Sequence, residues 1–351
     1  MKNEIYKNLK KLDDELAKEG ISRRDALKLF GLGSSSLLFA NSVELNATTK
    51  MYGSSKKVKI LIIGGGLAGI STAARLNNML ENPDITVVEP NDKSVSYQPG
   101  NTFICAGLYE KKDVIYNTNE YIPKGVKLIY DKAVEFNPDK NEVTLAKGQV
   151  LKYDFMVVAA GLVFDFAKIK GLEEAGDMYT QGDSKKLLEV LDNAGANTIY
   201  NTDAAVSTWQ NMQRVINEAA NGKKINAIFT HPNTAIKCGG APKKIMYLMN
   251  SRLNEAGIAA RANTTMTFYP NGNRLFGVKE YNDAIKKQFE ARNFKYNFAH
   301  NLIEVDAANK VAVFDHHWQV RGEYDEDLEE FDMITKHEKV RVPYDFLHIA
   351  P

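Results

Sequence analysis

The hydrophobic pattern alternates between strand-like runs and helical repeats from residue 58 onwards. Residues 58–63 form a β-branched apolar run, which is typical of a parallel strand covered on both faces. A helical pattern continues through Leu80, and residues 84–89 form a second strand-like run. A strand pattern at 224–230 and a helical pattern at 242–253 repeat this order. The alternation predicts an α/β protein with two Rossmann-like dinucleotide-binding domains.

Shorter strands and turn signals separate these two units. Residues 126–136, 142–146 and 150–153 are strand-like, with a turn pattern at residues 137–140. They predict a β-meander inserted into the first domain. We therefore expect a three-layer ββα architecture of meander, sheet and helices.

The length of 351 residues agrees with two domains after an N-terminal extension. We expect residues 1–55 to be a signal and linker, residues 56–186 to be the first domain and residues 187–330 to be the second. Residues 331–351 are expected to form a strand that returns toward the first domain.

Composition and charge narrow the class of protein. The chain has 44% apolar residues, and its 45 basic and 44 acidic residues leave a net charge of +1. This balance gives no electrostatic footprint for nucleic acid. The two cysteines cannot form a four-cysteine zinc site, and the six histidines lack metal-site spacing, so we expect no metal. These features favour an enzyme.

The N-terminal segment resembles an export signal. Arg23-Arg24 precedes a short, weakly apolar run at residues 29–40. This order is the twin-arginine pattern, which directs folded proteins out of the bacterial cytoplasm. We therefore expect a periplasmic protein.

A dinucleotide fingerprint follows the first strand. Gly64 permits a tight turn, Gly66 lets the backbone approach a pyrophosphate, and Gly69 packs the helix on the strand. Glu89 ends the second strand, where a carboxylate can accept a hydrogen bond from a ribose hydroxyl. A carboxylate there disfavours a 2′-phosphate, so the pattern predicts FAD or NAD.

The second unit lacks this fingerprint. Its strand is followed by residues 231–242, which contain no Gly-x-Gly-x-x-Gly pattern, and the next strand ends without an acid. Cys238 stands there instead, just before a predicted helix that opens with Pro242. The helix N-terminus and Lys237, Lys243 and Lys244 favour a nucleophilic thiolate. We expect Cys238 to be a redox cysteine and NADH to be no electron donor.

Several motifs resemble the sulfide:quinone oxidoreductases, which belong to the flavoprotein disulfide reductases. The segments that carry the resemblance are residues 236–247 (IKCGGAPKKIMY), 274–281 (RLFGVKEY) and 344–351 (YDFLHIAP). The inserted meander and the returning strand that ends at Gly161 also resemble the FAD half of those flavoproteins. The resemblance implies FAD as the cofactor. The implied FAD-binding residues are Gly64, Gly65, Gly66, Gly69, Glu89, Gln98, Val134 and Gly161.

The resemblance also implies a reaction and partners. In such enzymes sulfide attacks a disulfide, a persulfide forms, and the flavin passes two electrons to a membrane quinone. One rival is the flavin subunit of flavocytochrome c sulfide dehydrogenase, which passes electrons to a c-type haem subunit. Another is an inactive FAD-binding partner protein. An oligomer is compatible with each of these alternatives.

The chain also departs from the family pattern. The family's second catalytic cysteine and its membrane-contacting C-terminal helices lie beyond the segment that ends at Pro351. We therefore expect a truncated form whose missing segment makes the peripheral membrane contact. Cys105 matches neither family cysteine, and we interpret it as a small buried hydrophobic residue.

Overall fold

The computed structural model describes residues 57–95, 99–178, 184–325 and 330–351. The arginine pair of the predicted export signal and Gln98 lie outside these residues. Residues Ser54–Pro351 form one compact unit.

The first sheet is parallel, with the strand order β5-β2-β1-β9. Strand β1 (Lys59–Ile63) pairs with β2 (Asp84–Val88) on one side and with β9 (Phe155–Val158) on the other. Strand β5 (Lys127–Ile129) extends the sheet beyond β2. Residues 60–63 of β1 are all buried, as expected for a strand covered on both faces.

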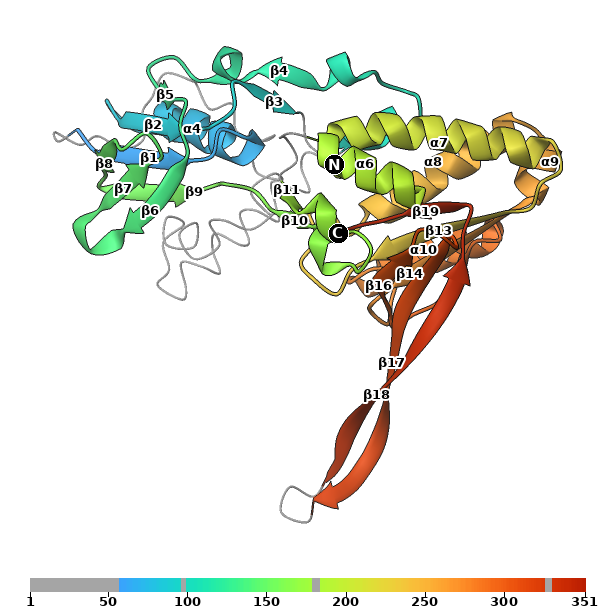
Figure 1. Cartoon of the computed structure of the whole chain (residues 1–351). Coiled ribbons are helices and arrows are strands. Elements are labelled where there is room, and N and C mark those ends of the chain that lie inside the picture. Colours follow the sequence, from blue (N-terminus) through green and yellow to red (C-terminus); the bar gives the residue numbers. More distant parts are fainter. Residues whose placement is uncertain (1–56, 96–98, 179–183, 326–329) are drawn as a thin grey trace, which may run out of the picture. The chain divides into compact units, whose positions relative to one another are not determined.

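Two layers cover this sheet. Helix α4 (Leu67–Met79) packs on the face that presents Ile60 and Ile62. The meander packs on the opposite face, against Leu61 and Ile63. Its strands are β6 (Ala133–Asn137), β7 (Glu142–Leu145) and β8 (Val150–Lys152). The predicted three-layer ββα architecture is confirmed (Figure 1).

The strand expected over residues 126–136 is divided in two by a turn at Asp131. The Asp131 carboxylate accepts hydrogen bonds from the backbone N–H groups of Lys132 (2.8 Å) and Lys147 (3.2 Å). This buried turn sends β5 into the parallel sheet and β6 into the meander. The hydrophobic pattern runs through the turn and therefore does not mark it.

The second sheet is also parallel, with the order β12-β19-β13-β14-β15. Its strands are β12 (Ala196–Asn197), β19 (Phe346–His348), β13 (Ile225–His231), β14 (Thr264–Pro270) and β15 (Lys295–Tyr296). The helices of this half are α6 (Lys185–Ala194), α7 (Thr202–Ala220), α8 (Ala241–Glu255), α9 (Ile258–Ala262) and α10 (Lys279–Ala291). The two predicted Rossmann-like units are therefore both present.

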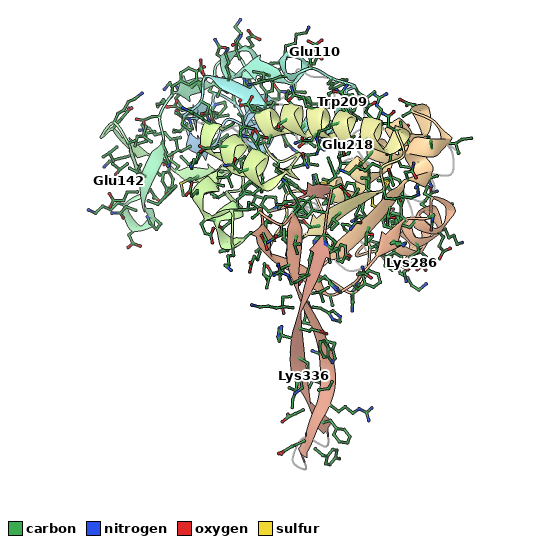
Figure 2. All side chains as sticks on the ribbon, turned by 45° about the vertical axis from the view of Figure 1, so that its right-hand side comes forward. Glu110, Glu142, Trp209, Glu218, Lys286 and Lys336 are labelled. Atoms are coloured by element: carbon green, nitrogen blue, oxygen red, sulfur yellow. The ribbon has the colours of Figure 1, made fainter. Side chains whose placement is uncertain are left out.

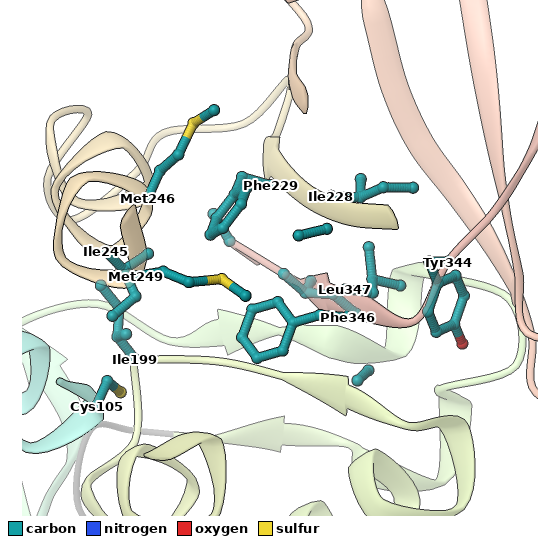
Figure 3. Packing of buried hydrophobic residues seen from close by; sticks show 14 of the residues in the cluster. Cys105, Ile199, Ile228, Phe229, Ile245, Met246, Met249, Tyr344, Phe346 and Leu347 are labelled. Carbon is teal, nitrogen blue, oxygen red and sulfur yellow. The ribbon is translucent and has the colours of Figure 1, made fainter. Parts of the chain in front are cut away.

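The largest apolar cluster lies around this second sheet. Figure 3 shows Phe229 and Phe346 of neighbouring strands together with Met246 and Met249 of α8. Cys105 belongs to the same cluster and is fully buried, which confirms its interpretation as a small buried residue. Burial raises the pKa of its thiol well above the ordinary value, so the group stays protonated.

Residues 331–351 do not take the expected course back to the first domain. Strand β19 instead lies between β12 and β13 in the second sheet. All three of its side chains, Phe346, Leu347 and His348, are buried. A central position in a parallel sheet covers both faces of a strand and so accounts for this burial.

An antiparallel sheet precedes β19. It contains β16 (His300–Asp306), β17 (Val311–Asp325) and β18 (Glu330–Pro343). The β16 pairing ends at His316, and β17 and β18 continue beyond it as a two-stranded ribbon (Figure 1). The side chains of this ribbon, Lys336 among them, project away from its backbone (Figure 2).

Shorter elements join the two sheets. They are β3 (Lys93–Val95), α5 (Pro99–Cys105), β4 (Ile115–Asn117), β10 (Phe164–Asp165) and β11 (Asp177–Met178). Within the described ranges, no helix has the length and apolar character needed to span a bilayer.

Candidate functional site

The turn after β1 depends on glycine at position 64. Gly64 has a φ of +108°, a value that residues with a side chain rarely adopt. Its N–H donates to the carbonyl of Val88 at 2.8 Å, which ties the turn to β2. A Cβ at this position would collide with the carbonyl of Ala159, just after β9. The predicted role of Gly64 in a tight turn agrees with this geometry.

Gly65 and Glu89 lie in direct contact. The N–H of Gly65 donates to Oε2 of Glu89 at 2.8 Å, and a Cβ on Gly65 would lie 2.7 Å from the Glu89 Cβ. Asn91 donates to the other carboxylate oxygen through its backbone N–H (3.0 Å) and its side-chain amide (2.8 Å). The Glu89 carboxylate is thus fixed at the end of β2. Sequence reasoning missed Asn91, whose only signal is its place two residues after the acid.

The N-terminus of α4 is suited to an anion. Gly66 is the N-cap and supplies no side-chain hydrogen bond, and the first turn holds no acidic residue. The backbone N–H groups there, together with the helix dipole, favour a phosphate. A Cβ on Gly66 would meet no protein atom within 4 Å, whereas one on Gly69 would collide with the carbonyl of Gly64. The fold itself therefore requires glycine at 69 but leaves open space at 66.

The other predicted FAD residues lie on separate segments. Val134 is on β6 of the meander with its side chain exposed. Gly161 follows β9, is exposed, and has a φ of +77°. Their contact with a cofactor stays a prediction, as does that of Gln98.

Cys238 lies in the loop between β13 and α8. Its carbonyl accepts the N–H of Ala241 at 3.0 Å, which closes the turn that begins α8. Pro242 occupies the first turn of that helix, as predicted. The hydroxyl of Tyr200 also donates to the Cys238 carbonyl, at 3.5 Å. Cys238 is a free, half-buried thiol, in contrast to the fully buried Cys105.

Lys237 lies within this loop, and Lys243 and Lys244 follow it in the first turn of α8. The environments of the three lysines differ. Lys243 is 4% exposed, whereas its neighbour Lys244 is exposed. The Lys243 ammonium donates to the carbonyl of Gly239 at 2.6 Å. Burial lowers the pKa of Lys243 to about 8. Burial also lowers the pKa of Lys237 from its ordinary value.

His231 and Tyr200 lie near the loop that carries Cys238. His231 ends β13, and its Nε2 would lie 3.6 Å from a Cβ built on Gly239. Burial lowers the pKa of His231, and the charge of Lys243 lowers it further. Burial and the nearby Cys238 raise the pKa of Tyr200, so both rings are neutral near pH 7.

Sequence reasoning missed His231 and Tyr200 as neighbours of this loop. The available signal for His231 was its place at the carboxyl end of a parallel strand, where ligands bind in open α/β sheets. Tyr200 lies far from Cys238 in sequence and carries no such signal. Among the described residues, no group of three His, Cys, Asp or Glu side chains could hold a metal ion.

Known proteins are similar to this chain over most of its length. Residues 58–206 match the pyridine nucleotide-disulphide oxidoreductase family model. The mitochondrial sulfide:quinone oxidoreductase of Mus musculus is 33% identical over 294 residues, which cover 84% of this chain and 56% of that protein. The chain is thus similar in sequence to two sulfide:quinone oxidoreductases. The mitochondrial enzyme of Dictyostelium discoideum is 32% identical over 295 residues, with the same shares covered.

A solved structure shares the fold. The sulfide:quinone oxidoreductase of Aquifex aeolicus superposes with a TM-score of 0.61 at 19% identity, over 84% of this chain and 58% of that chain. The resemblance predicted from the motifs is thus confirmed. The chain spans about half the length of the curated relatives it matches.

Proposed function

We propose that the chain binds FAD at the loop after β1 and oxidises sulfide through Cys238, with a quinone as the electron acceptor. The observation that carries the proposal is the half-buried thiol at the start of α8, where a dinucleotide-binding unit would have its glycine loop. The similarity to the Mus musculus and Dictyostelium discoideum sulfide:quinone oxidoreductases supports the choice of substrate.

The residues after β1 fit FAD. The uncapped N-terminus of α4 and the open space at Gly66 suit a pyrophosphate. Oε1 of Glu89 accepts two hydrogen bonds from Asn91, whereas Oε2 accepts one from Gly65 and retains a lone pair for a ribose hydroxyl. Bound FAD would supply a two-electron acceptor.

Cys238 would carry the sulfur atom. In the net half-reaction, a Cys238 thiolate and hydrosulfide form one S–S bond and release one proton and two electrons. The product is a persulfide on Cys238. The thiolate is the reactive form of the cysteine, and Lys243 supplies a buried positive charge beside it.

The test compares two cysteine variants by stopped-flow absorbance of the flavin. Cys238→Ser should bind FAD but show no bleaching by sulfide, because a serine hydroxyl cannot form a persulfide. Cys105→Ser is the matched control and should be bleached at the wild-type rate, because that thiol is buried in the apolar cluster. Normal bleaching in Cys238→Ser would remove this residue from the mechanism.

Separate experiments test the electron acceptor and the cellular location of the protein. We infer that the protein is exported by the twin-arginine route and contacts the inner membrane peripherally. Arg23→Lys combined with Arg24→Lys should leave it in the cytoplasm, because the export receptor recognises the arginine pair. Flotation of the intact protein, including the segment expected after Pro351, with quinone-containing vesicles separates a quinone acceptor from a c-type cytochrome subunit. Recovery only in the unbound fraction would favour the cytochrome.

A further inference from the structure

A buried lysine occupies an unfavourable position in helix α8. Lys243 is in the first turn of this helix, where the aligned peptide dipoles create positive potential. An ammonium group is disfavoured there, and an anion close by would stabilise it. Lys243 is nevertheless 4% exposed, so water cannot solvate its charge freely.

The protein groups around Lys243 do not neutralise it. Its Nζ donates to the carbonyl of Gly239 at 2.6 Å and lies 4.9 Å from the ring centroid of Phe268. Both contacts orient the ammonium but leave its charge in place. Burial lowers the pKa of Lys243, and the charge of Cys238 acts in the opposite direction and raises it.

We propose that Lys243 is a positioning residue that serves as the counter-cation of Cys238 and stabilises its anionic sulfur. The proposal rests on the proposed role of Cys238 as the sulfur carrier. The hydrogen bond to Gly239 holds the ammonium against the residue that follows Cys238. The same charge would stabilise the anionic persulfide, whose negative end is also sulfur.

The surrounding titratable groups are compatible with this pairing. From β13, His231 is neutral near pH 7 because burial and the Lys243 charge both lower its pKa. From the loop before α7, Tyr200 is neutral because burial raises its pKa. Lys237 precedes Cys238 and lies 5.8 Å from the centroid of Phe164. Lys243 itself, with a pKa of about 8, keeps its charge up to mildly alkaline pH.

The test measures alkylation of Cys238 by iodoacetamide between pH 6 and 10, with mass spectrometry as the readout. Lys243→Met should react about tenfold more slowly at pH 7, with its rate profile displaced by roughly one unit to higher pH. Lys243→Arg should keep a profile near the wild type, because it keeps the charge. Lys287→Met is the control and should leave the profile unchanged, since this exposed lysine lies on α10 and not on the helix that follows Cys238.

A wild-type profile in Lys243→Met would overturn the proposal. Lys243→Gln is shorter and polar, so it provides the same test if Lys243→Met does not fold, and a thermal melt by circular dichroism reports folding. A merely structural role would lower the melting temperature without moving the pH profile. Alkylation needs neither sulfide nor FAD, so this result is independent of the bleaching experiment. If Lys243→Met displaces the alkylation profile but sulfide still bleaches the flavin of Cys238→Ser normally, only the proposed function is rejected.

Discussion

The two strand–loop–helix units of this protein differ most in their loops. Between β1 and α4 lie only residues 64–66, whereas residues 232–240 separate β13 from α8. Both helices begin at a glycine without a side-chain cap and lack acidic residues in the first turn. The first turn of α4 has no basic residue, but that of α8 includes a proline and two lysines.

The difference shows how one arrangement can serve two chemistries. A short glycine loop leaves backbone N–H groups accessible at the helix N-terminus, which suits a phosphate. In the second unit, proline removes one N–H group, the longer loop carries a thiol, and the first turn of α8 adds a buried ammonium. The helix N-terminus alone therefore does not define the ligand. The residues of the loop and of the first turn define it.

The largest expected effect in this comparison of the two loops is that of a substitution at Gly66. Gly66→Val should abolish flavin binding, because the side chain would fill the space that the fold leaves open for a pyrophosphate. Flavin absorbance of the purified protein is the measurement. Gly66→Ala is the smaller control and should change the free energy of unfolding by no more than about 1 kcal/mol. Equal flavin content in wild type and Gly66→Val would contradict the assignment.

The second prediction concerns the electron donor. NADH should cause no flavin bleaching over the time in which sulfide bleaches it completely, because the loop after β13 has no glycine fingerprint for a second pyrophosphate. Stopped-flow absorbance with each donor on one sample makes the comparison. Rapid bleaching by NADH would show that the two loops bind similar ligands after all.

A substitution at Gly69 tests how closely helix α4 packs on the loop after β1, independently of any bound ligand. Gly69→Val should lower the free energy of unfolding by about 3 kcal/mol, because its Cβ would collide with the Gly64 carbonyl. Urea denaturation followed by circular dichroism measures the loss. The corresponding change at Gly257, where a Cβ meets no atom within 4 Å but φ is +114°, reports backbone strain alone. Similar losses at both sites would argue against the close packing of α4.

The last prediction concerns the pH dependence of the second sheet. Burial lowers the pKa of His348 in β19 to about 3, against 6.5 for an ordinary histidine. As the pH falls, the unfolded chain therefore takes up a proton at His348 before the folded chain does. The free energy of unfolding keeps its full His348 contribution above pH 6.5 and falls by about 1.4 kcal/mol per pH unit below it, down to about pH 3. His348→Leu should reduce this acid sensitivity, measured by urea denaturation from pH 7 to 4, and an unchanged pH dependence in this variant would contradict the assignment.

The sequence by itself determined the features that depend on neighbouring residues. The glycine spacing after residues 58–63 specified the turn, the helix start at Gly66 and the close packing at Gly69. The proline after Cys238 specified the start of α8. Such features can be inferred because backbone conformation and helix capping are local interactions.

The tertiary structure alone decided which distant segments meet. Strand β19 joins the second sheet between β12 and β13, and this position differs from the one expected for residues 331–351. The cluster of His231, Tyr200 and Lys243 around Cys238 likewise assembles from separate segments. Hydrophobic periodicity indicates that a strand is buried, but not which strands bury it, because strand pairing depends on the fit of whole surfaces. The sequence alone therefore indicated Cys238 and its neighbouring lysines, whereas the fold decides that Lys243 is buried and that Tyr200 contacts this loop.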